Sequence, residues 1–198
     1  MNAREEILSS VRDALGDAHG RQVEVPRGYR GRPGGEGLLD LFAERVADYK
    51  ATVTRCTAGQ LADAVAGALR GSGRVLVPDG FPHPVPGAVA DTGQSAADLD
   101  RLDAVVTTAT VGIAETGTIV LDHGPGQGRR ALSLVPDLHV CLVRADQVVP
   151  GVPEAIGRLD PARPQTWVSG PSATSDIELD RVEGVHGPRR LHVLLVDG

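Results

Sequence analysis

TVTRCTAGQLADAVAGALRGSGRVLVP, residues 52–78, is the stretch that most narrows the fold. Residues 52–56 form a short β-prone run, and residues 57–70 carry apolar side chains at helical spacing behind a threonine that can cap a helix. Two glycines end that helix, and residues 74–77, an arginine followed by three apolar residues, are typical of a buried strand. A strand–helix–strand order of this kind predicts a parallel sheet with right-handed crossovers.

The same alternation continues through the rest of the chain. Apolar β-branched runs predict strands, and segments with helical spacing or turn residues predict the helices between them. Beyond the first unit we expect strands at 104–108, 119–121, 138–143, 166–169 and 191–196, helices at 38–50 and 146–159, and a short helix or turn at 98–103. The sequence therefore predicts one α/β domain with about seven or eight strands.

The N-terminus predicts a helix joined to this domain by a polar link. Asn2 can cap a helix that ends near Leu15, and residues 16–37 are rich in Gly, Pro and Arg without periodicity. The helix carries one apolar stripe, formed by Ile7, Leu8, Val11 and Leu15. That stripe can pack either on its own domain or on a partner subunit. We expect a helix and flexible link over residues 1–37 and the α/β domain over residues 38–198.

Composition and charge limit the kinds of partner and the cellular compartment that suit this chain. With 198 residues, 41% hydrophobic content and a net charge of −6, the chain can build a core and does not suit nucleic acid as its main partner. Cys56 and Cys141 are isolated, and this spacing favours a reduced, cytoplasmic setting. Two cysteines also cannot supply the four thiolates of an ordinary iron–sulfur cluster. The histidines lack metal-site spacing, so we expect this chain to bind no metal or cofactor. A charged N-terminus and the lack of a long apolar run argue against a secretory signal or a membrane span.

GIAETGTIVLDHGPGQGRR, residues 112–130, has the composition of a functional site. It places a carboxylate and two threonines before a short strand, and a glycine-rich turn with two arginines after it. Alternate glycines let the backbone approach a ligand closely, and arginine suits a carboxylate or a phosphate. The candidates are Glu115 as a catalytic carboxylate, and Thr116, Gly117, Thr118, Gly124, Gly126, Gly128, Arg129 and Arg130 as anion-binding residues.

These residues also have structural interpretations. Glu115 can act as a nucleophile or general base, contact a ligand or partner, or accept hydrogen bonds that fix the turn. The glycine-rich turn lacks both the Walker lysine and the GxGxxG spacing. It is therefore either a generic anion pocket or a tight turn whose arginines face solvent.

A second cluster lies near the C-terminus, in SGPSATSDIE (169–178) and GVHGP (184–188). Its hydroxyls and amides can form an anion-binding nest, although helix capping and turn formation explain the same residue types. The candidates are Ser169, Gly170, Ser172, Asp176, Glu178 and His186. Because ligands bind at the carboxyl ends of strands in open α/β sheets, we expect both clusters to share one cleft.

The motifs AETGT, GPGQGR, SGPS, DIE and GVHGP, in that order, resemble the LUD-domain family and, within it, the lactate-utilisation proteins of type C. The resemblance extends from the REEIL start to HVLLV near the end. It implies a three-layer, mostly parallel fold of the sugar-phosphate isomerase, glucosamine-phosphate deaminase and CoA-transferase group. It also implies that the chain acts beside two iron–sulfur subunits, which carry the clusters, in the oxidation of L-lactate to pyruvate.

The alternative is a stand-alone enzyme that acts on an acyl-CoA, a sugar phosphate or a folate-like anion through Glu115. In the CoA-transferase relatives a glutamate followed by a glycine forms a covalent thioester, and Glu115-Thr116-Gly117 superficially resembles that arrangement. The two functions differ in that the first requires partner subunits, whereas the second requires turnover of a substrate by this chain alone.

Overall fold

The structure is a computed structural model that describes residues 2–18, 24–29, 31, 34–171 and 187–197. The chain divides into two units, Met1–Arg30 and Gly31–Gly198. The first unit contains α1 (Ala3–Leu15) and the short 3-10 turn η1 (Gly16–Ala18). Asn2 caps α1 reciprocally: its side chain accepts from the Glu5 N–H, and its own N–H donates to the Glu5 carboxylate, both at 3.0 Å. The first helix therefore begins and ends where the sequence predicted.

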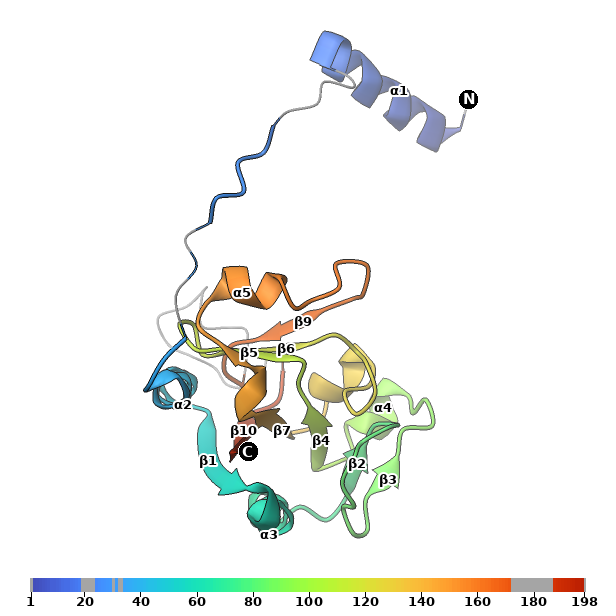
Figure 1. The fold of residues 1–198 in the computed structure, drawn as a ribbon. Coiled ribbons are helices and arrows are strands. Elements are labelled where there is room, and N and C mark those ends of the chain that lie inside the picture. The colour runs from blue at the N-terminus through green and yellow to red at the C-terminus, as the bar shows by residue number, and fades with distance from the viewer. Residues whose placement is uncertain (1, 19–23, 30, 32–33, 172–186, 198) are drawn as a thin grey trace. The chain divides into compact units, whose positions relative to one another are not determined.

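The second unit contains the remaining elements, which Figure 1 labels. Its helices are α2 (Leu38–Asp48), α3 (Leu61–Ala68), α4 (Ala96–Leu99) and α5 (Val152–Ile156), with 3-10 turns η2 (Ala58–Gln60), η3 (Arg130–Ser133) and η4 (Ala145–Gln147). Its strands are β1 (Thr52–Thr57), β2 (Val75–Val77), β3 (Val89–Ala90), β4 (Ala104–Thr108), β5 (Val111–Ile113), β6 (Thr118–Leu121), β7 (Leu138–Arg144), β8 (Val148–Val149), β9 (Thr166–Val168) and β10 (Arg190–Asp197). No helix in the described parts of the chain is both long and apolar enough to cross a membrane.

Six strands form a parallel sheet in the order β1-β10-β7-β4-β2-β3 (Figure 1). Its centre is β7, where six consecutive residues from Leu138 to Val143 are buried. A strand that is buried on both faces reads as a continuous apolar run, and this pattern made β4, β7 and β10 visible in the sequence. The predicted α/β class with a mostly parallel sheet and an N-terminal helical extension is confirmed.

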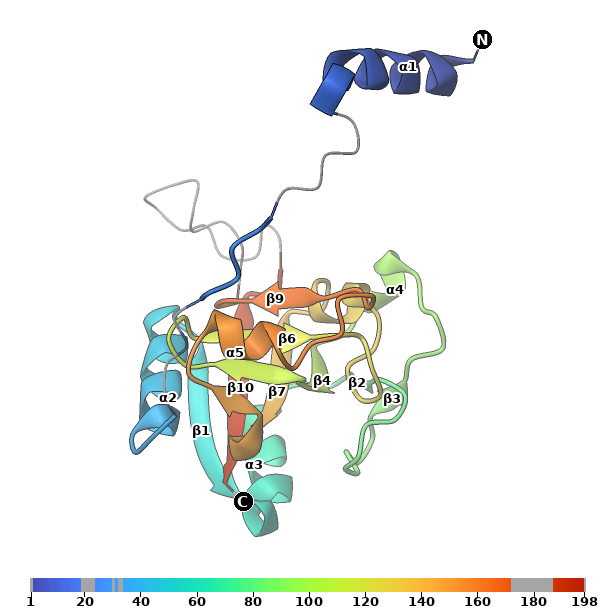
Figure 2. The ribbon, with the colours of Figure 1, turned by 45° about the horizontal axis from the view of Figure 1, so that its top comes forward.

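A second sheet, which the sequence did not predict, has the order β8-β5-β6-β9. In it β6 is antiparallel to both β5 and β9, and β8 is parallel to β5 (Figure 2). The helix predicted over residues 146–159 is wrong, because η4, β8 and α5 share this segment. The valine pair of β8 extends beside β5, and Pro153 stands in the first turn of α5, where proline is tolerated.

Two other predicted helices differ in their bounds. The helix expected over residues 57–70 begins as the 3-10 turn η2, capped by Thr57, and continues as α3 only to Ala68. The short helix or turn expected over residues 98–103 is the helix α4, which starts earlier because the side chain of Ser95 caps it by accepting from the Asp98 N–H.

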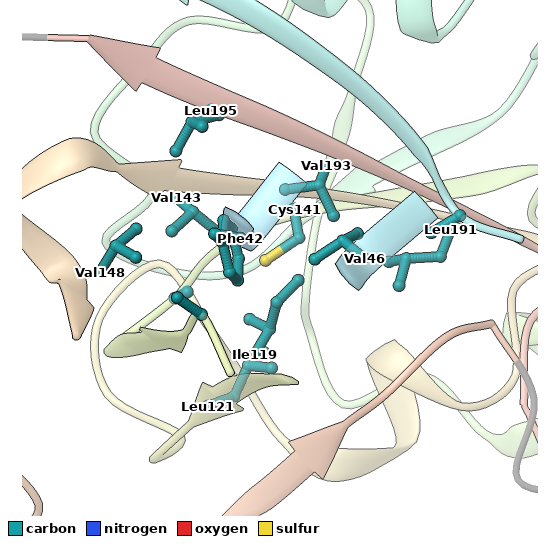
Figure 3. Packing of buried hydrophobic residues seen from close by; sticks show 13 residues of the cluster. Phe42, Val46, Ile119, Leu121, Cys141, Val143, Val148, Leu191, Val193 and Leu195 are labelled. Carbon is teal, nitrogen blue, oxygen red and sulfur yellow. The ribbon is translucent and has the colours of Figure 1, made fainter. Parts of the chain in front are cut away.

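The main core lies between the two sheets and α2. Figure 3 shows Phe42 of α2 and Ile119 of β6 pointing toward Cys141 of β7 and Val193 of β10. On the opposite face of the large sheet, α3 covers a second cluster of buried side chains. The outer face of the small sheet packs against α5 through Ala155. The small sheet is thus buried on both sides, which explains why all four residues of β6 are buried.

Candidate functional site

The turn between β5 and β6 carries Glu115 and two threonines. The main-chain N–H of Glu115 donates to the carbonyl of Pro150 (3.0 Å), and the residue is exposed. The Oγ1 atoms of Thr116 and Thr118 are 2.7 Å apart, and Thr118 Oγ1 lies 2.8 Å from Ser169 Oγ. These hydroxyls form a hydrogen-bonded chain that ties the turn to the end of β9.

Gly117 and Gly170 lie where the chain passes close to the end of α2. Gly117 has a φ of 59°, and a Cβ there would lie 2.5 Å from the carbonyl carbon of Arg45. Gly170 has a φ of 84°, and a Cβ there would lie 2.9 Å from the carbonyl oxygen of Tyr49. Both positions combine a left-handed backbone with contact against main-chain atoms, which explains the glycines by packing alone.

The glycine-rich turn after β6 lies against the ends of β2 and β4. The N–H of Gly126 donates to the carbonyl of Asp79, and the carbonyl of Gly126 accepts from the N–H of Thr108, both at 2.8 Å. Gly80 approaches the turn so closely that a Cβ there would lie 2.7 Å from the Cβ of Pro125. The turn therefore closes over two neighbouring strand ends.

Arg129 is held by protein groups. It donates from Nε and Nη2 to the carboxylate of Asp91 at 3.1 to 3.3 Å, and from Nη2 to the carbonyl of Gln94 at 2.7 Å. Burial raises the pKa of Asp91, but hydrogen bonds from Arg129 and the Gly93 N–H, together with the arginine charge, outweigh burial and lower that pKa. The guanidinium of Arg129 thus fixes the segment after β3.

Arg130 takes part in a chain of side chains with a histidine. Its Nη1 donates to Thr166 Oγ1 (3.3 Å), which also lies 3.0 Å from His123 Nε2. His123 Nδ1 lies 2.8 Å from the carbonyl of Gly128, and a carbonyl can only accept, so Nδ1 carries the proton. In the neutral ring, Nε2 then accepts from the threonine hydroxyl. His123 has a φ of 60° and Gly128 one of 68°, so two left-handed residues bracket the turn.

The predicted site residues divide between the two ends of β6, so the structure brings together only part of the cleft that we expected. Glu115 precedes β6, whereas the glycine-rich turn follows it. Because β9 is antiparallel to β6, Ser169 leaves β9 beside Thr118, at the Glu115 end. The rule on strand ends applies to parallel sheets, but β6 and β9 belong to the small antiparallel part of the fold (Figure 2). Ser172, Asp176, Glu178 and His186 lie outside the described residues.

An open cleft with a volume of about 370 Å³ lies beside the glycine-rich turn. It is situated at the carboxyl ends of three parallel strands of the large sheet: Gly80 follows β2, Thr108 ends β4 and Arg144 ends β7. The cleft is lined by Gly80, Pro82, Thr108, Ala109, Thr110, Asp122, Gly124, Pro125, Gln127, Arg144, Gln147 and Arg163. This is the position at which parallel α/β sheets bind ligands.

Gln127 holds the floor of this cleft together. It is 7% exposed, and its Oε1 accepts from the main-chain N–H of Asp122 (2.6 Å). Because that N–H can only donate, the amide orientation is fixed, and Nε2 donates to Thr110 Oγ1 at 2.8 Å. The hydroxyl proton of Thr110 is then left to donate elsewhere.

Asp122 and Arg163, which both line the cleft, form an ion pair. Arg163 Nη1 lies 3.0 Å from Asp122 Oδ2, with side chains 41% and 12% exposed, respectively. Asp122 Oδ1 accepts from the Gly124 N–H at 3.1 Å. A Cβ on Gly124 would lie 2.9 Å from Arg163 Nη2, so glycine at this position leaves room for the guanidinium.

Sequence reasoning found the loop of this cleft but missed most of its polar groups. Gly124 was a candidate, whereas Thr108, Thr110, Asp122 and Gln127 were not. The rule on strand ends could have indicated Thr108, which ends a predicted strand. Arg163 lies 33 positions after Arg130 in a loop without a motif, and nothing in the local sequence marks it.

Two histidines on strands of the large sheet have pKa values that burial lowers. His139 Nε2 lies 2.7 Å from Thr107 Oγ1, and burial lowers the pKa of His139 to about 4. His192 Nε2 lies 2.8 Å from Thr54 Oγ1, and burial also lowers its pKa. Within the described ranges, no three His, Cys, Asp or Glu side chains are grouped so that they could hold a metal ion.

Comparison with known proteins defines the class. The LUD domain matches residues 39–196, nearly the whole second unit, so the chain belongs to the LUD-domain family. The resemblance seen in the sequence motifs is therefore confirmed.

Individual members of this family show which proteins the chain is similar to. The chain is 51% identical over 168 residues to a Deinococcus radiodurans protein named Lactate utilization protein C, covering 80% of this chain and 79% of the relative. A Bacillus pumilus protein of the same name is 39% identical over 93 residues, which cover 43% of this chain and 38% of that protein. A crystal structure of a DUF162 family protein from Deinococcus radiodurans superimposes with a TM-score of 0.71 at 44% identity, over 83% of this chain and 99% of that one.

Proposed function

We propose that this chain is a subunit without clusters of an L-lactate utilisation system, in which iron–sulfur partner proteins join it in oxidising L-lactate to pyruvate. The observation that carries the proposal is the 51% identity with a protein named Lactate utilization protein C over 80% of the chain. The chain then belongs to lactate catabolism in the cytoplasm, as a component of an L-lactate-oxidising complex.

The two cysteines support the view that partners carry the clusters. Cys56 faces α3 from β1, whereas Cys141 faces the small sheet from β7, and β10 lies between these strands. The thiols are therefore on opposite faces of the sheet, and two strand spacings together with a three-residue offset in register put them more than about 10 Å apart. Burial raises the pKa of Cys56 and raises that of Cys141 to about 12, against the hydrogen bond from Thr107, whereas a cluster needs thiolates.

The N-terminal helix gives the proposal a feature that partners can use. Within the N-terminal unit, Ile7 is 63% exposed and Val11 48% exposed, and that unit buries no residue of α1. An exposed apolar stripe on a tethered helix is suited to docking in a groove of another protein. We propose that α1 contributes to association with the iron–sulfur partners.

Growth on L-lactate tests the proposed function. A strain that lacks this chain should fail to grow on L-lactate as sole carbon source, grow normally on glucose, and recover when the full chain is restored. The restored, affinity-tagged chain should co-purify with proteins that contain iron, and deletion of residues 2–37 should reduce that recovery. Normal growth of the deletion strain on L-lactate would refute the proposal.

The role of Glu115 is tested in the same strain. A catalytic carboxylate should make Glu115→Gln unable to restore growth on L-lactate at a normal protein level, because the change removes charge and little volume. Glu44→Gln on the exposed surface of α2 serves as the matched control. Equal growth of the two variants would remove Glu115 from the catalytic residues and leave it a role in fixing the turn.

A further inference from the structure

The cleft beside the glycine-rich turn contains a cation with unused hydrogen-bonding capacity. Arg163 lies 3.0 Å from Asp122 as an ion pair, yet none of the hydrogen bonds among the described residues uses its guanidinium N–H groups. Arg129, in contrast, directs its donors to Asp91 and Gln94. A guanidinium with free N–H groups at the mouth of a cleft is suited to paired hydrogen bonds with a planar anion.

Two threonine hydroxyls that line the same cleft add neutral donors. Thr110 Oγ1 accepts from Gln127 Nε2 at 2.8 Å, so its own proton is available to an acceptor in the cleft. Within the described part of the chain, the hydroxyl of Thr108 has no hydrogen-bond partner. Both threonines stand at the carboxyl end of β4, where the glycines of the neighbouring turns leave open space.

The charge of the cleft selects between the anions that arginine recognises. Two arginines line the cleft, and each has a carboxylate beside it: Asp122 is fixed next to Arg163, and Asp146 lies 2.9 Å from Arg144, so much of the positive charge is offset. A doubly charged phosphate would lie against these carboxylates, whereas a singly charged, planar carboxylate meets less repulsion and fits the guanidinium fork. The volume of about 370 Å³ leaves room for a group attached to that carboxylate.

We propose that this cleft binds a small-molecule monocarboxylate, with Arg163 and the hydroxyl of Thr110 as its donors and Asp122 placing the guanidinium. The assignment depends on the cleft alone and not on the proposed function, because the purified chain suffices to test it.

The test measures the binding of acetate, L-lactate and pyruvate to the full-length chain, either by NMR chemical-shift changes or by calorimetry. At least one of these probes should bind saturably, and Arg163→Gln should weaken that binding by about tenfold or more, as expected for loss of a charge-assisted hydrogen bond. Arg101→Gln is the matched control, because Arg101 is exposed and paired with Asp98 away from the cleft. This control should bind as the unmodified chain does.

A second variant removes the site without removing the arginine. Gly124 does not have a positive φ, so Gly124→Ala is allowed by the backbone, but its Cβ would lie 2.9 Å from Arg163 Nη2 and 3.0 Å from Asp122 Oδ1 and would displace the ion pair. This variant should remain folded, as far-UV circular dichroism would show, and lose binding to a similar extent as Arg163→Gln. The proposal is overturned if no carboxylate binds, if Arg163→Gln binds as tightly as the unmodified chain, or if inorganic phosphate binds as tightly as the carboxylates.

Discussion

Gly117→Ala should destabilise the protein strongly, because the contact it disturbs is with main-chain atoms. A Cβ at Gly117 would lie 2.5 Å from the Arg45 carbonyl carbon, 2.6 Å from its oxygen and 2.7 Å from the Val46 nitrogen. The left-handed φ of 59° costs alanine about 1 to 2 kcal/mol. Overpacking against α2 costs about 1 to 3 kcal/mol more. We therefore expect the free energy of unfolding to fall by about 2 to 5 kcal/mol.

Gly71→Ala is the matched control for this prediction. Gly71 has a φ of 87°, and a Cβ there would meet no atom within 4 Å, so alanine pays the backbone cost without the clash. Denaturant unfolding followed by far-UV circular dichroism measures both variants against the unmodified chain. Equal losses would refute the contact between the β5–β6 turn and α2. Unchanged stability of Gly117→Ala with weakened anion binding would assign Gly117 to a ligand site instead.

Two further predictions concern buried polar side chains. The free energy of unfolding should fall by on the order of 3 kcal/mol as the pH falls from about 6.5 to about 4. In the unfolded chain His139 gains a proton at its ordinary pKa, whereas in the folded chain burial lowers its pKa to about 4, so protonation favours the unfolded chain over this range. Unfolding at a series of pH values should show a flatter dependence for His139→Gln, and equal slopes would contradict the assignment. Gln127→Ala should lower the free energy of unfolding by about 1 to 3 kcal/mol, because it leaves the buried Asp122 N–H without an acceptor. The same change at the partly exposed Gln165 should cost less, and an equal cost at both would exclude the network around Gln127.

The large sheet could be predicted because each of its long strands is a continuous apolar run. Residues 138–143 and 191–196 have this pattern, and both are central strands in the structure. The small sheet could not be predicted in the same way. β5 has three residues and β8 two, which is too short for any periodicity, and a tertiary partner decides their conformation. The valine pair of β8 reads equally well as part of a helix until β5 is placed beside it.

The candidate site was predicted only in part, because local sequence shows tight turns but not the long-range pairs of side chains. The glycines at 124, 126 and 128 indicated close approach of the backbone, and the turn does lie against the ends of β2 and β4. Sequence spacing could not reveal that Arg129 is bound to Asp91, 38 positions earlier. It also could not reveal that Arg163 supplies a cation to the cleft. Long-range pairings of this kind depend on the register of the sheets and leave no local pattern.

The turn at Glu115 and the cleft lie at opposite ends of β6, and the fixed register of this strand connects them. Ile119 and Leu121 are buried against the large sheet, and Val120 is buried toward α5. A shift of one residue would exchange these faces, so the register of β6 is strongly specified. The hydroxyl contact between Thr118 and Ser169, together with the packing of Gly117 on α2, fixes one end of the strand. The other end continues directly into Asp122, so the residues that anchor the Glu115 turn also determine where the carboxylate of the cleft is held.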